Sequence, residues 1–277
     1  MASLTGLEAH EKYLYPVVRV SCGSSSGSGT IIYSGMVESE KYSTYILTNH
    51  HVIAGAIRIA DEWDSDLGKE IKKEIRSIVY VEVFKYRNLS TPVGTMKLEA
   101  DVVIYNKTED MAIVKIRLDD KMKYIATLPA KDKTEEYRVA DESIASGCSL
   151  GWPPLLSKGL ITRIGLQAKS LPFDMSSAQI IFGNSGGAMF TADGTLIGVP
   201  SMIASMGWSG VVSHMGLFIP IKRIYEWLEK EHYDFIYDPA KDEKTCLEAR
   251  EKEIEEKKTA ERIQTRSRDV PDLEEEA

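Results

Sequence analysis

The sequence predicts an all-β fold of two antiparallel barrels or sandwiches, followed by helical segments toward the carboxyl end. Residues 17–130 contain a series of short runs rich in Val, Ile, Thr and Tyr, the residue types that favour strands. A polar stretch at 131–143 interrupts the series, and similar runs resume over 144–237. Many short strands on both sides of a polar connector are typical of a chain that folds into two β units.

The predicted strands follow one another at short intervals. In the first unit they are "VVRVSC", "GTIIYSG", "STYILTNHHVI", "IVYVEVFKY", "MKLEADVVIYN" and "MAIVKIRL". In the second unit they are "IASGCSLG", "GLITRIGLQAK", "AQIIFG", "AMFTADGTLIGVPSMIA" and "MGLFIPI". The pair Asp193-Gly194 is a strong hairpin signal within this second group. Residues 1–16 precede the first strand as an amino-terminal segment.

Two segments predict helices instead. Residues 61–77 predict an amphipathic helix inserted into the first unit, because its large apolar residues recur near one stripe. These residues are Trp63, Leu67, Ile71 and Ile75. The inserted helix either packs over a barrel end, which we favour, or forms a lid over a cleft. Further along, "IKRIYEWLEKEH" from Ile221 predicts a closing helix with one apolar face.

Residues 238–277 form a strongly charged tail. Of the 37 residues from 241 to 277, 22 are charged, and few are apolar. This composition predicts a solvated helix followed by a frayed end. Docking of the charged helix to a protein partner or to a second subunit is the alternative.

Composition and charge exclude several classes of function. The net charge of −8 argues against nucleic acid as a partner, because phosphate binding needs a basic face. No apolar run is long enough to span a bilayer, so no membrane partner is expected. The amino-terminal sequence contains no recognisable export signal, and the three cysteines are odd in number and far apart. These features predict a cytoplasmic or otherwise intracellular protein, with association with a virus particle left open.

Three short stretches carry residues suited to nucleophilic catalysis. "IFGNSGGAMF" places Ser185 among small and turn-forming residues, which is typical either of a surface hairpin or of a turn that exposes a nucleophile. "YILTNHHVIAG" ends a strand with two histidines, and "EDMAIVKI" opens a buried strand with Asp110. A carboxylate entering a buried strand needs a partner, and an imidazole N–H is a suitable one. Each stretch is weak alone, but together they predict a serine, histidine and aspartate acting as one unit.

These stretches, in the order "TNHHV", "DMAIVKI" and "GNSGGAMF", resemble the signature segments of the chymotrypsin-like (trypsin-fold) serine proteases. The closer similarity is to the bacterial HtrA/Deg-type branch, and it covers roughly residues 17–230. "GSGTIIY", "GCSLGWPPLLSKGLITRIG", "GTLIGVPSMIA" and "GLFIPIKRI" are similar to further strands of that family. The resemblance implies two six-stranded antiparallel β-barrels.

The resemblance also implies roles for individual residues. The family pattern Thr-x-x-His assigns His51 as general base and later general acid, with His50 as its neighbour. Asp110 corresponds to the orienting aspartate and Ser185 to the nucleophile. The backbone N–H groups of Gly183 and Ser185 would form the oxyanion hole. Such an enzyme needs no cofactor, and the scattered histidines and cysteines offer no spacing for a metal site.

The substrate pocket is also inferred from the resemblance. Gln179 stands where the family's primary pocket has its base, and a neutral amide gives no reason to select Lys or Arg. Ser201, Met202 and Ile203 are expected to line the pocket wall, and Phe182 is expected to narrow or block the groove. We therefore expect a preference for uncharged, small to medium apolar residues at P1, the substrate residue before the cleaved bond.

Three classes of function follow from these residues. The first is a serine endopeptidase acting on protein or peptide substrates through an acyl-enzyme. The second is a catalytically silent relative that uses the fold for binding or as a structural part of an assembly. An esterase with a nucleophile elbow is excluded, because its catalytic residues follow the order Ser, Asp, His, whereas here the order is His, Asp, Ser. No PDZ-like domain is recognisable in the sequence, so the peptide sensing of HtrA proteins is not expected.

Overall fold

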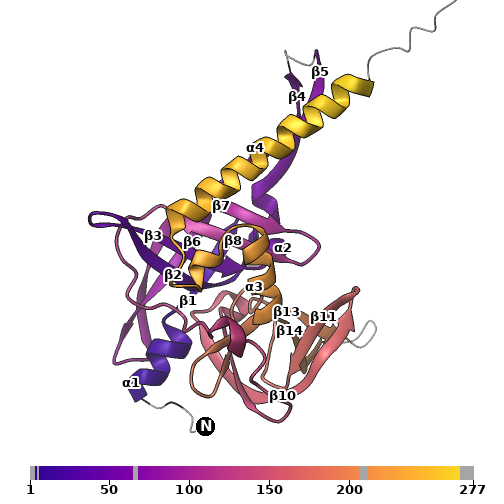
Figure 1. Ribbon diagram of the computed structural model, residues 1–277. Coiled ribbons are helices and arrows are strands. Elements are labelled where there is room, and N and C mark those ends of the chain that lie inside the picture. Colours follow the sequence, from indigo (N-terminus) through magenta and orange to yellow (C-terminus); the bar gives the residue numbers. More distant parts are fainter. Residues whose placement is uncertain (1–3, 5, 65–67, 206–210, 269–277) are drawn as a thin grey trace, which may run out of the picture.

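The computed structural model describes residues 4, 6–64, 68–205 and 211–268, and the fold is built on two closed six-stranded barrels (Figure 1). The first barrel has the order β1-β2-β3-β8-β7-β6. Its strands are β1 (Val17–Cys22), β2 (Ser25–Glu38), β3 (Lys41–Thr48), β6 (Val79–Arg87), β7 (Thr91–Asn106) and β8 (Met111–Ile116). All neighbouring strands pair antiparallel.

The second barrel has the order β10-β11-β14-β13-β12-β9, again with antiparallel neighbours. Its strands are β9 (Glu142–Gly147), β10 (Leu155–Ala168), β11 (Leu171–Ser176), β12 (Ala188–Thr191), β13 (Leu196–Ser205) and β14 (Val211–Pro220). The two barrels confirm the predicted all-β class. Within the described residues, closure leaves neither barrel with a free edge strand.

Strands β3 and β8 are buried along most of their length, because both of their faces are covered. Ile46 and Val114 point into the core of the first barrel. Tyr45 and Ile113, one residue away, belong instead to a core that continues into the second barrel and includes Phe190. Successive residues of a strand point to opposite faces, so this alternation places the ends of β3 and β8 beside the second barrel.

The predicted helix at 61–77 is wrong: the described part of this segment lies mainly in strands β4 (Ile57–Asp64) and β5 (Lys69–Arg76), which pair antiparallel, while Leu67 lies outside the described residues. Its apolar residues recur every four positions, and a spacing of four keeps residues on one face of a helix and also on one face of a strand. Gly68, with φ +61°, lies immediately before β5, and such a backbone is typical of a turn. Opposite charges also meet across the pair, where Lys73 lies 2.7 Å from Glu62.

Short helices connect the barrels, and longer ones follow them. They are α1 (Gly6–Ala9), η1 (His10–Leu14), α2 (His50–Ile53), η2 (Ala54–Ala56), η3 (Lys131–Lys133), η4 (Ser149–Gly151), α3 (Ile221–Lys230), η5 (Asp234–Ile236) and α4 (Glu243–Arg268). Helices α3 and α4 form where the sequence predicts them. The apolar face of α3 is buried, including Ile224 and Leu228.

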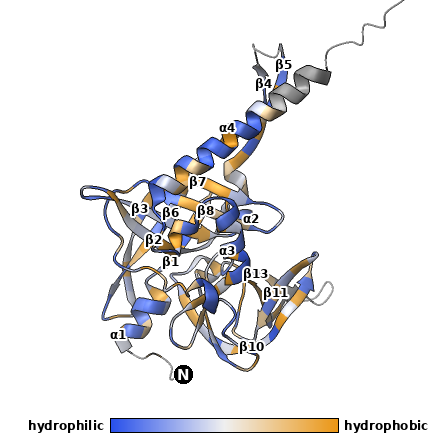
Figure 2. Ribbon diagram, viewed as in Figure 1, coloured by the Kyte–Doolittle hydropathy of each residue, from blue (hydrophilic) through white to orange (hydrophobic). Residues whose placement is uncertain are grey.

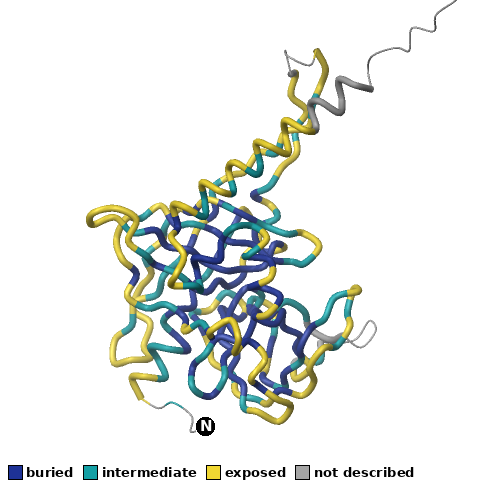
Figure 3. Tube along the Cα trace, in the orientation of Figure 1, coloured by how far each residue is buried: buried dark blue, intermediate teal, exposed yellow. Residues whose placement is uncertain are grey.

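Helix α4 leaves the first barrel and extends past it beside the β4–β5 hairpin, forming an arm that projects from the body (Figure 1). The arm is largely hydrophilic and exposed, in contrast to the barrel strands (Figures 2 and 3). Where the helix begins, the buried side chain of Glu243 accepts a hydrogen bond of 2.7 Å from Tyr45. None of the helices in the described part of the chain is long and apolar enough to cross a membrane.

Candidate active site

Strand pairing brings His51 and Asp110 together. Strands β3 and β8 are neighbours, with Thr48 opposite Ala112. His51 lies in α2, just beyond the end of β3, and Asp110 immediately precedes β8. Both residues therefore lie at the same end of the first barrel, although 59 positions separate them in the sequence.

The carboxylate of Asp110 binds His51 at both its ring and its backbone. Nδ1 of the ring lies 3.0 Å from Oδ1 and 2.8 Å from Oδ2, and the backbone N–H donates to Oδ1 at 3.0 Å. Ser201 of the second barrel donates to Oδ2 at 2.7 Å. Because Nδ1 faces a carboxylate it carries the proton, which leaves Nε2 of the neutral ring as an acceptor.

The electrostatics of Asp110 favour its ionised form. Burial raises the pKa of its carboxyl group, but the hydrogen bonds from His51 and Ser201 and the charge of the His51 ring outweigh burial, so the pKa lies below its usual value. Asp110 also has φ 58°, an uncommon backbone conformation for a residue with a side chain. Asn49 donates to its carbonyl oxygen at 2.8 Å, which helps to hold this turn in place.

The serine turn, residues 183–187 of the second barrel, packs against the first barrel through Ser28 of β2. The Ser28 N–H donates to the carbonyl of Ser185 at 2.8 Å, and its hydroxyl donates to the carbonyl of Gly183 at 2.6 Å. The same hydroxyl accepts from the N–H of Cys148 at 2.7 Å. The backbone carbonyl of Ser28 accepts from the Thr48 hydroxyl at 2.7 Å. Ser28 is fully buried, so its bonds tie the serine turn to the strand end that carries His51.

Gly186 makes this approach possible. It has φ +83°, and a Cβ atom there would lie 2.2 Å from the Ser28 carbonyl oxygen and 3.1 Å from the backbone nitrogen of Asn49. Only glycine fits such a close backbone contact. Ser185 is therefore adjacent in sequence to Gly186, whose backbone lies close to Asn49 in the segment that leads into His51.

The peptide unit between Phe182 and Gly183 has a fixed direction. The Phe182 carbonyl accepts from the N–H of Leu150 at 2.8 Å. In a trans peptide the N–H points opposite to the C=O, so the Gly183 N–H points away from the Leu150 loop. Within the described residues, neither the Gly183 N–H nor the Ser185 N–H has an acceptor, whereas those of Gly186 and Gly187 do. Free N–H groups flanking a serine are the donors that an oxyanion needs.

A cavity of about 410 Å³ lies beside the His51–Asp110 pair. Of the residues predicted to form the substrate pocket, Ser201 and Met202 line this cavity, while Gln179 and Phe182 do not. Gln179 is exposed, and its N–H donates to Ser157 at 2.7 Å. Phe182 is also largely exposed. Ile203 lies in β13, and its side chain falls outside the described part of the structure.

Sequence reasoning missed the contacts of three polar residues around the site. Ser201 was predicted only to line the pocket wall, but it also binds Asp110. Ser28 was noted only as part of the "GSGTIIY" strand, although it contacts the serine turn directly. His50, predicted only as a neighbour, packs against Tyr105 at 5.3 Å between ring centroids, and burial lowers its pKa. All three depend on contacts between distant segments, which no local pattern reveals.

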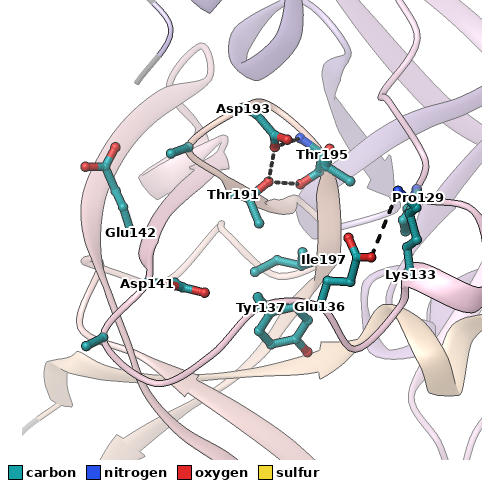
Figure 4. A pocket seen from close by; sticks show the side chains of 12 residues that line it. Pro129, Lys133, Glu136, Tyr137, Asp141, Glu142, Thr191, Asp193, Thr195 and Ile197 are labelled. Carbon is teal, nitrogen blue, oxygen red and sulfur yellow. Dashed lines mark hydrogen bonds and ion pairs between the residues drawn. The ribbon is translucent and has the colours of Figure 1, made fainter. Parts of the chain in front are cut away.

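A larger cavity, of about 450 Å³, lies away from these residues, between the connector and strands β12 and β13 (Figure 4). Its lining includes Tyr137, Asp193 and Ile197. The Asp193 carboxylate there is already bound by Thr191 and by the N–H of Thr195. None of the predicted catalytic residues lines it, so it lies apart from the candidate site. Among the described residues, no group of three His, Cys, Asp or Glu side chains is placed to hold a metal ion.

Two closed barrels, with a histidine–aspartate pair and a glycine-rich serine turn at their junction, define a trypsin-like peptidase domain. Residues 27–199 match the family described as the trypsin-like peptidase domain, and the chain belongs to this family. Within it, the similar proteins are of the HtrA/Deg type.

Two relatives illustrate this similarity. The chain is 27% identical over 194 residues to a probable periplasmic serine endoprotease, DegP-like, of Hahella chejuensis, covering 68% of this chain and 32% of that one. It is 26% identical over 198 residues to the periplasmic pH-dependent serine endoprotease DegQ of Escherichia coli, covering 70% and 34%. The chain thus matches about a third of the length of these curated relatives.

A solved structure gives the same result. The HtrA-type protease AlgW, determined with a tripeptide, superimposes with a TM-score of 0.58 at 26% identity, covering 82% of this chain and 63% of that one. The match in fold and in sequence therefore points to the same branch of the family.

The relatives contradict the predicted location. Several are named periplasmic serine endoproteases, which points to an extracytoplasmic location, so the prediction of a cytoplasmic or intracellular protein is wrong. That prediction rested on the amino-terminal sequence and on three unpaired cysteines. Neither feature determines the compartment, because proteins outside the cytoplasm also fold without disulfides. Cys22 and Cys148 are buried here and pack as small apolar side chains.

Proposed function

We propose that the chain is a serine endopeptidase that hydrolyses peptide bonds through an acyl-enzyme, with Ser185 as nucleophile, His51 as general base and acid, and Asp110 as the orienting carboxylate. The observation that carries this proposal is the bond from His51 Nδ1 to Asp110 at 2.8 Å, with the serine turn packed against the same strand end. Support also comes from the family and from relatives named as serine endoproteases.

The first half of the proposed reaction forms the acyl-enzyme. The Ser185 hydroxyl oxygen attacks the carbonyl carbon of the substrate, and its proton passes to Nε2 of His51. The negative charge that develops on the carbonyl oxygen is held by the N–H groups of Gly183 and Ser185. His51 then gives its proton to the leaving amine as the carbon–nitrogen bond breaks. Asp110 keeps the ring in the required tautomer and stabilises its charged form.

The second half hydrolyses the ester. A water molecule gives a proton to His51 and attacks the acyl carbon, and the same N–H groups stabilise the new oxyanion. Collapse returns the proton to the Ser185 oxygen and releases the acid. The low pKa of Asp110 supports this role, because the carboxylate must stay ionised while the imidazole gains its charge.

The oxyanion hole is supported by the fixed direction of the Phe182–Gly183 peptide. The bond from Leu150 to the Phe182 carbonyl keeps that oxygen out of the space needed by the substrate oxyanion. Removing one oxyanion donor in such an enzyme costs about 3–4 kcal/mol of transition-state stabilisation. At the substrate pocket, we propose that P1 is uncharged and small to medium apolar, since Met202 and Ser201 carry no charge. Equal or faster cleavage of a peptide with Arg or Lys at P1 contradicts this.

The experiment that tests the proposal is labelling with a fluorophosphonate probe, which reacts with activated serines. We expect the wild type to be labelled, and Ser185→Ala and His51→Ala to be unlabelled. Ser39→Ala and His214→Ala are matched controls, because both residues are exposed and lie outside the site; these variants keep their labelling. Peptide hydrolysis should fall by about four orders of magnitude or more in the two site variants.

Two outcomes contradict the proposal. An unlabelled but folded wild type indicates a catalytically silent member of the family. Equal labelling of the wild type and Ser185→Ala indicates that another group reacts with the probe.

A further inference from the structure

The cavity beside His51 carries two lysines at its edge. Lys107 belongs to the turn between β7 and β8, and Lys169 to the turn between β10 and β11, so one comes from each barrel. Apolar side chains of Leu171, Phe173 and Met202 also line the cavity. It therefore combines an apolar surface with two cationic groups next to the candidate catalytic histidine.

Neither lysine has a carboxylate partner among the described residues, although most other charged groups nearby are paired. Asp110 is the one carboxylate in the lining, and the hydrogen bonds from His51 and Ser201 already occupy it. Glu109, next in the chain, pairs with Arg223 at 3.2 Å, outside the cavity. The cavity thus has unneutralised positive charge, in a chain whose net charge is −8.

The charge of Lys107 acts inside the cavity. Burial lowers the pKa of His50, the charge of Asp110 opposes this, and the charge of Lys107 lowers the pKa further. His50 also lines the cavity. A cation that influences His50 is close enough to attract an anionic group placed in the same space.

The local backbone does not account for Lys169. Lys169 and Ser170 have φ 50° and 64°, and the flanking residues Ala168 and Leu171 pair across the hairpin. A two-residue hairpin turn with positive φ at both positions favours Asn and Gly, which adopt this conformation with little strain. The turn gives no reason for a lysine, whereas the paired strands of the hairpin place that lysine in the lining of the cavity.

We propose that this cavity binds an acidic side chain of a substrate residue other than P1, so that the enzyme favours peptides with Glu or Asp close to the scissile bond. The carboxylate lies between Lys107 and Lys169, and the methylene groups contact Met202 and Leu171. This inference rests on the proposed peptidase function and names the substrate class that the same site selects.

The test uses sets of peptides that keep one apolar residue at P1 and differ at a single other position near the scissile bond, with Glu, Gln or Lys placed there in turn. We expect wild-type kcat/KM to be highest for Glu and lowest for Lys. Exposed charge pairs contribute up to about 1 kcal/mol each, which corresponds to a preference of about five-fold per lysine. The preference decreases at 0.5 M salt (roughly a 4 Å screening length), because exposed charges are screened.

Variants assign the preference to the two lysines. Lys107→Gln and Lys169→Gln should each lower the ratio of kcat/KM for the Glu peptide to that for the Gln peptide about two- to five-fold. The double variant Lys107→Glu, Lys169→Glu should have a higher kcat/KM for the Lys peptide than for the Glu peptide. Lys169→Asn suits the turn better than lysine, so a lowered ratio in this variant does not come from misfolding. Lys244→Gln removes the same charge from α4 and keeps the wild-type ratio. Equal rates for the Glu, Gln and Lys peptides in the wild type overturn the proposal.

A binding measurement separates this proposal from the peptidase function. The affinity of Ser185→Ala for a fluorescent Glu-containing peptide is compared with its affinity for the matching Gln peptide. The affinity of the double variant Ser185→Ala, Lys107→Gln for the Glu peptide is measured as well. Lysine-dependent binding without any hydrolysis by the wild type supports the cavity and contradicts the peptidase proposal. Hydrolysis at equal rates for all the peptides supports the peptidase proposal and contradicts the proposed binding of an acidic side chain in the cavity.

Discussion

Asp110 connects the two barrels at the level of single atoms. Its carboxylate receives hydrogen bonds from His51, which lies just beyond β3, and from Ser201, which lies in β13. Without Ser201, one oxygen of a mostly buried carboxylate would lose a donor, and hydrogen bonds to charged groups contribute about 1.5–3 kcal/mol. Ser201 is therefore a positioning residue: it acts on Asp110, which in turn orients the imidazole.

We expect Ser201→Ala to lower kcat by about ten-fold or more with a smaller change in KM, because the lost bond orients the base. It should also change the pH dependence of stability. The depressed pKa of Asp110 stabilises the fold above the unfolded value of about 3.9, and this contribution is lost as the pH falls through the folded pKa. The variant raises that folded pKa, so its difference from wild type in free energy of unfolding should narrow below about pH 4.

Urea unfolding from pH 3 to pH 7 (from about one unit below to about three units above the unfolded carboxyl pKa) measures this difference in free energy of unfolding. Ser201→Thr keeps the hydroxyl and serves as the conservative control, with partial recovery of kcat. A Ser201→Ala variant with wild-type kcat and an unaltered acid profile contradicts the assignment.

At the scale of an element, strand β2 carries two buried serines, Ser28 and Ser34, and the two differ in what they contact. Ser28 binds the carbonyl oxygens and N–H groups of the serine turn and its neighbouring loop. Ser34 binds Thr44 at 2.8 Å and accepts from the Met122 N–H at 3.0 Å, both within the first barrel. The strand thus offers a matched pair in which similar hydrogen bonds serve different regions.

We expect Ser28→Ala and Ser34→Ala to lower the free energy of unfolding by similar amounts, about 1–3 kcal/mol, because each leaves buried backbone or hydroxyl groups without a partner. Only Ser28→Ala should also lower kcat, since it releases Gly183 and Cys148 from their shared partner. Urea unfolding and peptide kinetics on both variants measure this. Equal loss of kcat in the two variants indicates a general effect of stability rather than positioning of the serine turn.

The elements also show how far the sequence allowed prediction. The barrel strands were predicted because apolar runs between turn signals depend on local pattern alone. The β4–β5 hairpin was mistaken for a helix because residues four apart, such as Ile71 and Ile75, satisfy both periods. His51, Asp110 and Ser185 were found from a resemblance in short motifs. The bond from Ser201 to Asp110 and the lysine pair at the cavity arise only when segments from the two barrels meet, so no local pattern contains them.

At the scale of the molecule, the candidate site lies where the two barrels meet, and a shared core holds that junction. This core joins Tyr45 of β3 and Phe190 of β12 to residues of α3 and η5. Tyr45 packs on Tyr233 and Phe235 at ring-centroid distances of 5.8 and 5.6 Å. The segment after the second barrel therefore returns to cover the first, and α4 begins at this point. Partner binding by the rest of the charged helix stays a prediction.

The buried pair of Tyr45 and Glu243 anchors the start of α4, and its removal should lower the stability of the whole fold. Tyr45 is almost fully buried and donates to Glu243, which also lies 3.5 Å from Lys115. Glu243→Ala leaves the tyrosine hydroxyl without an acceptor, so we expect the free energy of unfolding at pH 7 to fall by about 2–3 kcal/mol. Glu243→Gln retains an acceptor and should lose less. Glu251→Ala, at an exposed position on the same helix, is the control and should stay within about 0.5 kcal/mol of wild type.

The same pair should produce a characteristic response to alkali. Burial, reinforced by the hydrogen bond to Glu243, raises the pKa of Tyr45 above its ordinary value. A raised folded pKa stabilises the native state fully below the unfolded value of about 10 and loses that contribution as the pH rises further. Because burial keeps the folded pKa of Tyr45 above the unfolded value in both proteins, wild type and Glu243→Ala should lose stability in parallel above about pH 10. Urea unfolding between neutral pH and pH 11 (about one unit above the ordinary tyrosine pKa) measures both pH profiles. A wild type whose free energy of unfolding does not fall above about pH 10 contradicts a buried, neutral Tyr45, and a variant as stable as wild type at neutral pH contradicts the anchoring role of Glu243.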